Sequence, residues 1–214
     1  MKSPIQWLLG LFAAALPLSC SLDESLPKDW VLNRGYQQQL ATPEAQQEVL
    51  TALETLFGTA LAPHWPLGDA QGSGAEALAK AAADFRAECT HCHGLEGYGN
   101  GPSSVFQNPK PWNFGLGVFP RTAPGGGEPR IEDLMRLLHD GIGGSAMPAF
   151  ARLGEDRLRA LAGHVLLLAR RSAMEQELVK ARLAGEAGSL TPEAVRALYE
   201  TWEQKRSAPA GSGH

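Results

Sequence analysis

The sequence predicts an all-α fold in which amphipathic helices are separated by long loops. Apolar side chains recur at helical spacing in four segments, and a fifth segment is rich in alanine, a strong helix former. The 214 residues include 24 glycines and 15 prolines, which favours a loop-rich chain. The formal net charge of -4 is not that of a basic nucleic-acid-binding protein, so no nucleic-acid partner is expected.

Two helices are predicted in the first half of the chain. The first begins at Thr42-Pro43, an N-cap followed by proline at the first helical position, and ends at Gly58. The second covers residues 75–89. We expect residues 24–72 to form an extension that packs on the domain that follows or on a partner. The apolar face of the first helix is formed by Val49, Leu53, Leu56 and Phe57.

A loop over residues 94–129 follows, and its many glycines and prolines predict little regular structure. A loop of this length is unusual in a compact domain unless it has a function, such as wrapping one edge of a cofactor. Three more amphipathic helices are predicted after it, and the tail from Arg206 is expected to be disordered. These helices cover residues 131–140, residues 155–171 and the residues that follow Thr191-Pro192.

The second helix leads into the motif Cys89-Thr90-His91-Cys92-His93. Two cysteines on one helical turn can each form a thioether with a haem vinyl group, and the next histidine then lies against the iron. A redox dithiol would usually follow a strand, which no pattern before Cys89 predicts, and a zinc site would need further ligands. We therefore predict that Cys89 and Cys92 hold one c-type haem and that His93 ligates its iron, with His91 pointing away.

Met147 is the predicted second iron ligand. It lies in a glycine-rich loop between Gly143 and Pro148, and glycines let a backbone approach a cofactor closely. A methionine sulfur opposite a histidine nitrogen raises the reduction potential of such an iron. The alternative interpretation is a core methionine that fills a gap. Met135 is expected to be a core residue, and Met174 fits the ligand position poorly.

Two other histidines compete for the second ligand position. His139 is expected to cap the end of its helix or to lie at the surface, with iron ligation as the alternative. His164 is expected at the boundary of the inward face of its helix, because Leu161 and Val165 flank it there.

Several polar side chains are candidates for contacts around a haem. Trp112 and Asn113 could donate hydrogen bonds to a propionate, and Arg121 and Arg130 could pair with one. The alternative for Trp112 is that its ring covers the haem edge. Five arginines are expected to line a solvated helix face, with a docking patch for a charged partner as the alternative. They are Arg152, Arg157, Arg159, Arg170 and Arg171.

Residues 1–19 are predicted to be an export signal. Lys2 precedes an apolar stretch of about a dozen residues, which is short for a spanning helix of about 20. The stretch runs from Trp7 to Leu18, and Ser19 and Cys20 follow it. This pattern resembles a bacterial lipoprotein signal, although Pro17 departs from it. The resemblance implies that Cys20 carries lipid, which would explain a cysteine without a partner. Ordinary cleavage nearby or an uncleaved anchor are the alternatives.

Residues 75–172 resemble a class I c-type cytochrome domain. The resemblance is carried by the helix before the cysteine motif, by Gly94 to Pro102, by Gly143 to Phe150 and by the closing amphipathic helix. It implies a small all-helical bundle around one haem, with the first and last core helices crossing near the haem edge. It also implies that the Pro102 carbonyl accepts a hydrogen bond from the His93 ring, which orients the ring and raises its basicity.

The predicted organisation has four parts. They are a signal over 1–19, a tether and helical extension over 20–74, the cytochrome-like domain over 75–172, and a C-terminal helical extension and tail over 173–214. With both axial positions filled by protein, the iron would offer no open site to a substrate, so we expect an electron carrier and not an enzyme.

The expected role is one-electron transfer in a bacterial respiratory or periplasmic redox chain, with the protein anchored on the periplasmic side of the membrane by lipidated Cys20. The expected partner is a quinol-oxidising complex, a terminal oxidase or a dehydrogenase. One alternative is a fixed haem subunit of a larger membrane-associated oxidoreductase complex, because the apolar faces of the flanking helices need cover. Another is a haem enzyme or gas sensor in which Met147 is displaced from the iron.

Overall fold

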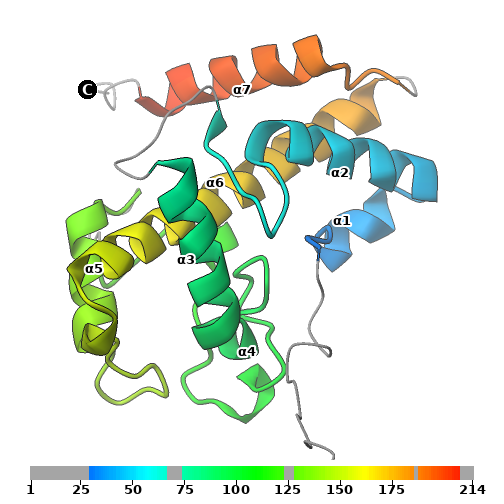
Figure 1. Cartoon of the computed structure of the whole chain (residues 1–214). Coiled ribbons are helices and arrows are strands. Elements are labelled where there is room, and N and C mark those ends of the chain that lie inside the picture. The colour runs from blue at the N-terminus through cyan, green and yellow to red at the C-terminus, as the bar shows by residue number, and fades with distance from the viewer. Residues whose placement is uncertain (1–28, 67–73, 123–127, 186–187, 208–214) are drawn as a thin grey trace, which may run out of the picture.

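The computed structural model describes residues 29–66, 74–122, 128–185 and 188–207 (Figure 1). The regular structure in these ranges is helical, apart from one isolated bridge between Gly58 and Pro63, so the fold is all-α as predicted. The predicted signal and Cys20 lie outside the described residues. The helices are α1 (Arg34–Gln39), α2 (Pro43–Phe57), α3 (Ala75–Glu88), α4 (Thr90–His93), α5 (Ile131–Asp140), α6 (Glu155–Ala184) and α7 (Pro192–Ser207).

Local signals in the sequence set the ends of several helices. The Thr42 side chain accepts a hydrogen bond from the backbone N–H of Ala45 and caps α2, as predicted. Gly58 and Gly141 end α2 and α5 with φ angles of 73° and 70°, which glycine adopts without strain. The loop between α4 and α5 contains only two short 3₁₀ turns in its described part, η3 (Ser104–Phe106) and η4 (Phe114–Leu116).

Helix α6 is longer than the sequence predicted. The predicted end at Arg171 was wrong, because α6 continues to Ala184 and has 30 residues. At 1.5 Å per residue it is about 45 Å long. The domain boundary predicted at residue 172 therefore falls inside a continuous helix. A 3₁₀ turn, η5 (Ala151–Leu153), precedes α6.

Helix α6 is the scaffold on which the other long helices pack. Helices α3 and α5 pack against it, and α2 also contacts it. In Figure 1, α7 lies across α2, on the same side of the molecule as the C-terminal part of α6. Helix α2, in the extension that precedes α3, therefore contacts both α6 and the helix that follows it.

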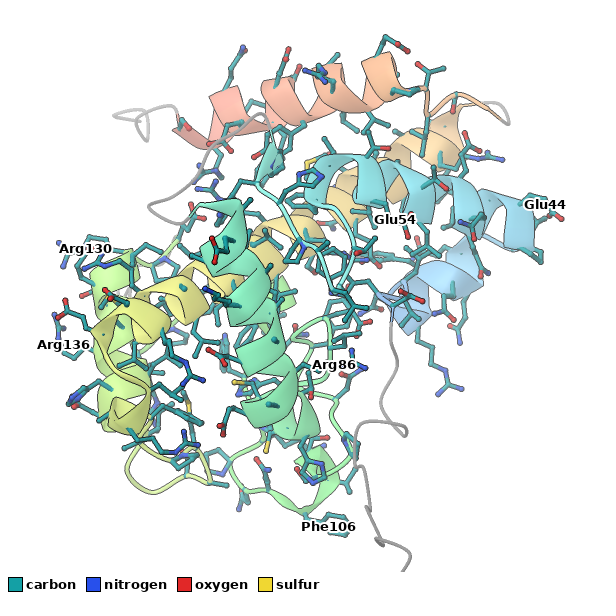
Figure 2. All side chains as sticks on the ribbon, viewed as in Figure 1. Glu44, Glu54, Arg86, Phe106, Arg130 and Arg136 are labelled. Carbon is teal, nitrogen blue, oxygen red and sulfur yellow. The ribbon has the colours of Figure 1, made fainter. Side chains whose placement is uncertain are left out.

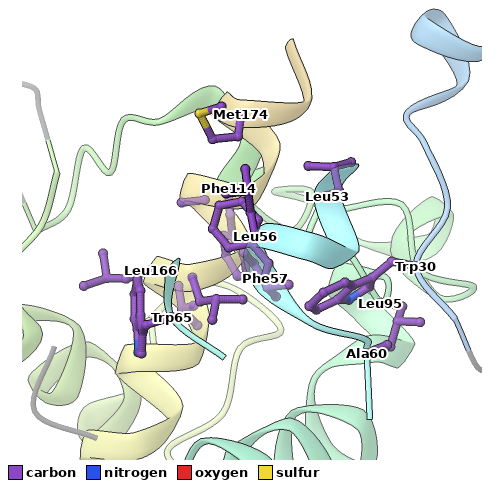
Figure 3. Packing of buried hydrophobic residues seen from close by; sticks show 14 of the residues in the cluster. Trp30, Leu53, Leu56, Phe57, Ala60, Trp65, Leu95, Phe114, Leu166 and Met174 are labelled. Atoms are coloured by element: carbon purple, nitrogen blue, oxygen red, sulfur yellow. The ribbon is translucent and has the colours of Figure 1, made fainter. Parts of the chain in front are cut away.

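The apolar faces of α2, α6 and α7 are buried against one another. The rings of Phe57 and Tyr199 meet edge to face with their centroids 6.1 Å apart. One continuous cluster of buried hydrophobic residues joins this region to the rest of the core (Figure 3). The flanking helices therefore cover each other, and their apolar faces do not require a partner protein. Buried members from these helices include Val49, Leu53, Phe57, Met174, Leu178, Val195 and Tyr199.

Two of the five arginines that the sequence assigned to a solvated face are buried. The guanidinium group of Arg170 lies over the ring of Trp65 and binds Glu128 at 2.6 Å. Arg171 lies over Trp30, is 1% exposed, and binds Glu175. The prediction was wrong for these two because partners compensate their burial. Glu128, Trp65 and Trp30 are distant in sequence, and Glu175 lies one turn further along the same helix.

The other three arginines lie at the surface and form ion pairs within the protein. Arg152 pairs with Glu88, Arg157 with Asp84 and Arg159 with Glu132.

In the described part of the chain, no helix is both long and apolar enough to cross a membrane.

Candidate functional site

The cysteine motif lies where α3 passes into the short helix α4. The backbone N–H of Cys89 donates to the Phe85 carbonyl at 2.8 Å, and the N–H of His93 donates to the Cys89 carbonyl at 2.8 Å. These bonds keep the motif in helical turns, so the two sulfurs and the imidazole are presented from one short segment. The Thr90 hydroxyl donates to the Arg86 carbonyl at 2.6 Å and fixes the junction of the two helices.

One cavity of about 300 Å³ contains the side chains of Cys89, Cys92, His93 and Met147. The structure thus brings together four residues that lie up to 58 positions apart in the sequence. The walls come from α3, the loop after α4, α5 and α6, and they are mainly apolar. They include Phe85, Phe114, Phe119, Leu134, Leu138 and Phe150.

Two glycines allow the segments of this site to approach closely. A Cβ atom on Gly101 would lie 2.7 Å from the backbone of Cys92, so only glycine fits against the motif. Gly141 has a φ of +70°, and its Cβ would lie 2.7 Å from the backbone of Pro148 and of Ala149. The end of α5 is therefore packed directly on the Met147 loop, whose carbonyl at Met147 accepts from the Ile142 N–H at 3.1 Å.

The His93 ring is held by a backbone carbonyl and an aromatic ring. Its Nδ1 lies 3.2 Å from the Trp112 carbonyl oxygen, which can only accept, so Nδ1 carries the proton. The Phe114 ring stacks on the imidazole, with centroids 4.8 Å apart and planes 24° apart. Burial lowers the pKa of His93, although the bond to Trp112 works against this shift. The ring is therefore neutral with its lone pair on Nε2, as a metal ligand requires.

The predicted hydrogen bond from His93 to the Pro102 carbonyl was wrong. Pro102 is exposed and is not among the residues that line the cavity. The Trp112 carbonyl takes its place because the Phe114 N–H donates to the Gly97 carbonyl at 2.9 Å and holds this segment beside the motif. A backbone acceptor has no signature in the sequence, so the motif alone could not reveal it.

Trp112 is a wall of the cavity, and its indole N–H is already used. Its Nε1 donates to the Val118 carbonyl at 2.8 Å, which leaves no donor for a propionate. Arg130 binds Asp133 at 2.9 Å and projects from the outer side of α5 (Figure 2), away from the cavity lining. Arg121 lines the cavity, as does Lys110, which the sequence interpretation missed. The lining of the cavity therefore includes two cations, which are the chemistry that would pair with anionic groups of a cofactor.

The two sulfurs have different surroundings. Burial raises the pKa of the Cys89 thiol to about 12, so this thiol is neutral near pH 7. Catalytic dithiols have lowered thiol pKa values, so this environment favours a neutral sulfur over a reactive thiolate. The Cys92 sulfur accepts from the Gln107 amide at 2.9 Å and lies 3.3 Å from the Ser103 hydroxyl. Within the described ranges, no three His, Cys, Asp or Glu side chains gather to hold a metal ion.

The competing nitrogens lie outside the cavity lining. His139 is exposed and its Nδ1 lies 2.7 Å from the Asp140 carboxylate. His164 is 2% exposed, so the boundary position predicted for it was wrong. Its ring packs on Phe85 with centroids 5.1 Å apart, and burial lowers its pKa to about 4. His91 is exposed, in line with its expected orientation away from the site.

The donor set and the cavity walls fit a c-type haem. Two thiols lie on one helical turn, the His93 imidazole is neutral with its lone pair on Nε2, and Met147 lines the same apolar cavity. Covalent attachment through vinyl groups needs the thiols, and low-spin ligation needs the nitrogen and the thioether.

Residues 76–165 match the family model described as cytochrome C oxidase, cbb3-type, subunit III. The matched range contains every ligand candidate and ends inside α6. Helices α2 and α7 lie outside it. No curated protein and no solved structure matches the chain.

Proposed function

Because residues 76–165 form a class I c-type cytochrome domain, we propose that this protein carries single electrons through one covalently attached haem. The haem, when bound, supplies one-electron chemistry, and the protein supplies attachment, ligation and burial. The observation that carries the proposal is the placement of neutral His93 and of Met147 in the cavity that also holds both cysteines.

Each residue of the site has a distinct task in this proposal. Cys89 and Cys92 would hold the haem covalently, and His93 Nε2 and the Met147 sulfur would ligate its iron. The Trp112 carbonyl and the Phe114 ring fix the orientation of the His93 imidazole. A histidine–methionine pair in an apolar cavity favours the reduced state, since it raises the reduction potential.

An optical spectrum of the purified holoprotein tests this ligand set. We expect a low-spin spectrum with a near-infrared charge-transfer band from the methionine sulfur to ferric iron. Met147→Ala should remove that band and give high-spin ferric haem. Met135→Ala is the matched control, because Met135 is a partly buried methionine outside this cavity, and it should keep the band. A high-spin spectrum in the unchanged protein would contradict the proposal.

A free carrier is favoured over a fixed subunit by the packing of the extensions. The family description names a subunit of an oxidase, which supports the second possibility. However, α2 and α7 bury their apolar faces within this chain, so the feature that suggested missing companions is accounted for. Extraction in mild detergent followed by native mass measurement distinguishes a free carrier from a fixed subunit. A single chain supports a carrier, and stable companions support a subunit.

Displacement of Met147 would instead make the protein a haem enzyme or a gas sensor. Carbon monoxide binding by the reduced protein at neutral pH would support that class. We expect no binding, because His93 and Met147 would both ligate the iron and leave it no open position.

We also propose that the protein is exported and held at the periplasmic face of the membrane by lipid on Cys20. The sequence around Cys20 supports this, as described above. Mass measurement of the mature protein should show a chain that begins at Cys20 with an acyl modification. Cys20→Ser should release the protein from the membrane fraction without changing the haem spectrum.

A further inference from the structure

A buried polar cluster lies beside the site and has no task in the proposed function. It contains Glu96, Arg171 and Glu175, which are 6%, 1% and 0% exposed. The cluster joins three parts of the chain: the loop after α4, the middle of α6 and the segment before α1. Charged side chains are rarely buried to this extent unless they are paired. The groups that compensate the burial of Glu175 and of Glu96 therefore have to be identified for each carboxyl group.

Glu175 is a fully compensated carboxylate. One oxygen accepts from the backbone N–H of Asn33 at 2.6 Å. The other accepts from the Tyr98 hydroxyl at 2.6 Å and from the Arg171 guanidinium at 3.2 Å. Three donors stabilise the charged form, and Arg171 neutralises it. The Arg171–Glu175 pair therefore carries no net charge.

Glu96 is the second carboxyl group, and no second cation accompanies it. It accepts from the Val31 N–H at 2.9 Å, and the described residues place no basic side chain in ion-pair contact with it. Burial raises the pKa of Glu96, and the Glu175 charge adds to this shift. Hydrogen bonds from the backbone N–H groups of Val31 and of Glu96 itself, and the Arg171 charge, lower the pKa but do not cancel the rise. The cluster therefore holds one excess negative charge whenever Glu96 is ionised.

The loop that carries Glu96 is fixed directly to the residue that ligates the iron in the proposed function. Glu96 follows His93 by three positions, so their Cα atoms are at most about 11 Å apart. The Gly99 N–H donates to the His93 carbonyl at 2.8 Å, and Gly97 N–H donates to the Gly94 carbonyl at 3.2 Å. A change of charge at the iron bound by His93 therefore alters the electrostatic potential at Glu96.

We propose that Glu96 is a redox-linked proton site, which binds one proton when the haem is reduced and releases it when the haem is oxidised. This inference rests on the proposed function, because it needs a bound haem. Reduction adds one electron from the redox partner and removes one positive charge, and Glu96 takes one proton from water to form the neutral acid. Because like and opposite charges nearby shift a carboxyl pKa, the loss of one positive charge at the haem on reduction raises the proton affinity of Glu96.

The surroundings of Glu96 leave it as the group that titrates. From α6 it faces Arg171 and Glu175, which neutralise each other, and its own loop adds Tyr98, whose hydroxyl is bound to Glu175 and whose pKa is raised by burial. The segment 30–33 contributes uncharged side chains. Val31, which donates to Glu96, is 46% exposed, so the carboxyl lies close to solvent for proton exchange.

The midpoint potential of the holoprotein, measured by optical redox titration from about pH 5 to about pH 9, tests this inference. We expect the potential to fall with rising pH over a window above the usual glutamate pKa. Glu96→Gln keeps the acceptor for Val31 and cannot bind the proton, so its potential should be flat over that window. Glu54→Gln, an exposed change on α2 (Figure 2), is the control and should keep the slope.

A flat potential in the unchanged protein, or an equal slope in Glu96→Gln, would overturn the inference. Reduced-minus-oxidised infrared spectra of the unchanged protein give a readout that does not depend on the variant folding. They should show a protonated carboxyl group gained on reduction, and its absence would also overturn the inference. Failure of the proposed function is distinguishable, since it would appear as a missing haem or a high-spin spectrum before any titration.

Discussion

His93 illustrates how one side chain acquires its chemistry from backbone atoms. The Trp112 carbonyl fixes the proton on Nδ1, and the Phe114 ring restricts the plane of the imidazole. Neither effect depends on a polar side chain, so neither is visible in the spacing of the motif. The identity of the four ligand candidates followed from the sequence, whereas the atoms that orient His93 required the fold.

His164 makes the stability of the protein depend on pH. Its folded-state pKa is about 4, below the 6.5 of an unfolded chain, because burial disfavours the charged ring. As pH falls from about 6.5 to about 4, the unfolded state binds the proton first, and stability is lost by about 3 kcal/mol. Denaturant unfolding at several pH values measures this loss.

The control for that prediction is His164→Leu, which removes the titrating ring from the same buried position. The difference in unfolding free energy between the two proteins should change with pH across this window. An unchanged difference from neutral pH to about pH 4 would contradict the assignment of the effect to His164.

At the scale of elements, local signals in the sequence predicted the ends of α2 and α5, but they did not predict how far α6 continues. Thr42, Gly58 and Gly141 mark ends that capping rules predict. The continuation of α6 beyond Arg171 was missed because Arg170, Arg171 and Glu175 give its buried face a polar sequence. Their partners Glu128, Trp30 and Tyr98 are distant in sequence, so hydrophobic periodicity cannot detect the compensation.

The buried pair in the middle of α6 should be sensitive to the loss of one partner. Arg171→Leu leaves Glu175 buried without its cation, and we expect the unfolding free energy to fall by about 3–5 kcal/mol. Arg157→Leu is the matched control on the same helix, because the exposed pair with Asp84 is screened by water. Denaturant titration of both variants measures these losses. Equal losses of unfolding free energy in the two variants would show that burial of the ion pair does not determine the loss.

At the scale of the whole molecule, the extensions and the haem-binding part share one core. The buried cluster runs from Trp30 and α2 through α6 to the walls of the cavity. We therefore expect a single cooperative unfolding transition, in which haem absorbance and tryptophan fluorescence change together. Two separated transitions in denaturant would show that the extensions containing α2 and α7 unfold independently of the haem-binding part.

The hydrogen bond from Val31 to Glu96 also has an evolutionary consequence. The donor is a backbone N–H, and the Val31 side chain faces solvent at 46% exposure, so almost any residue can supply the same contact. Proline is the exception, because it has no N–H to donate. Related chains can therefore keep this hydrogen bond while their sequences before α3 diverge. The expected constraint on the residue at position 31 is only that it is not proline.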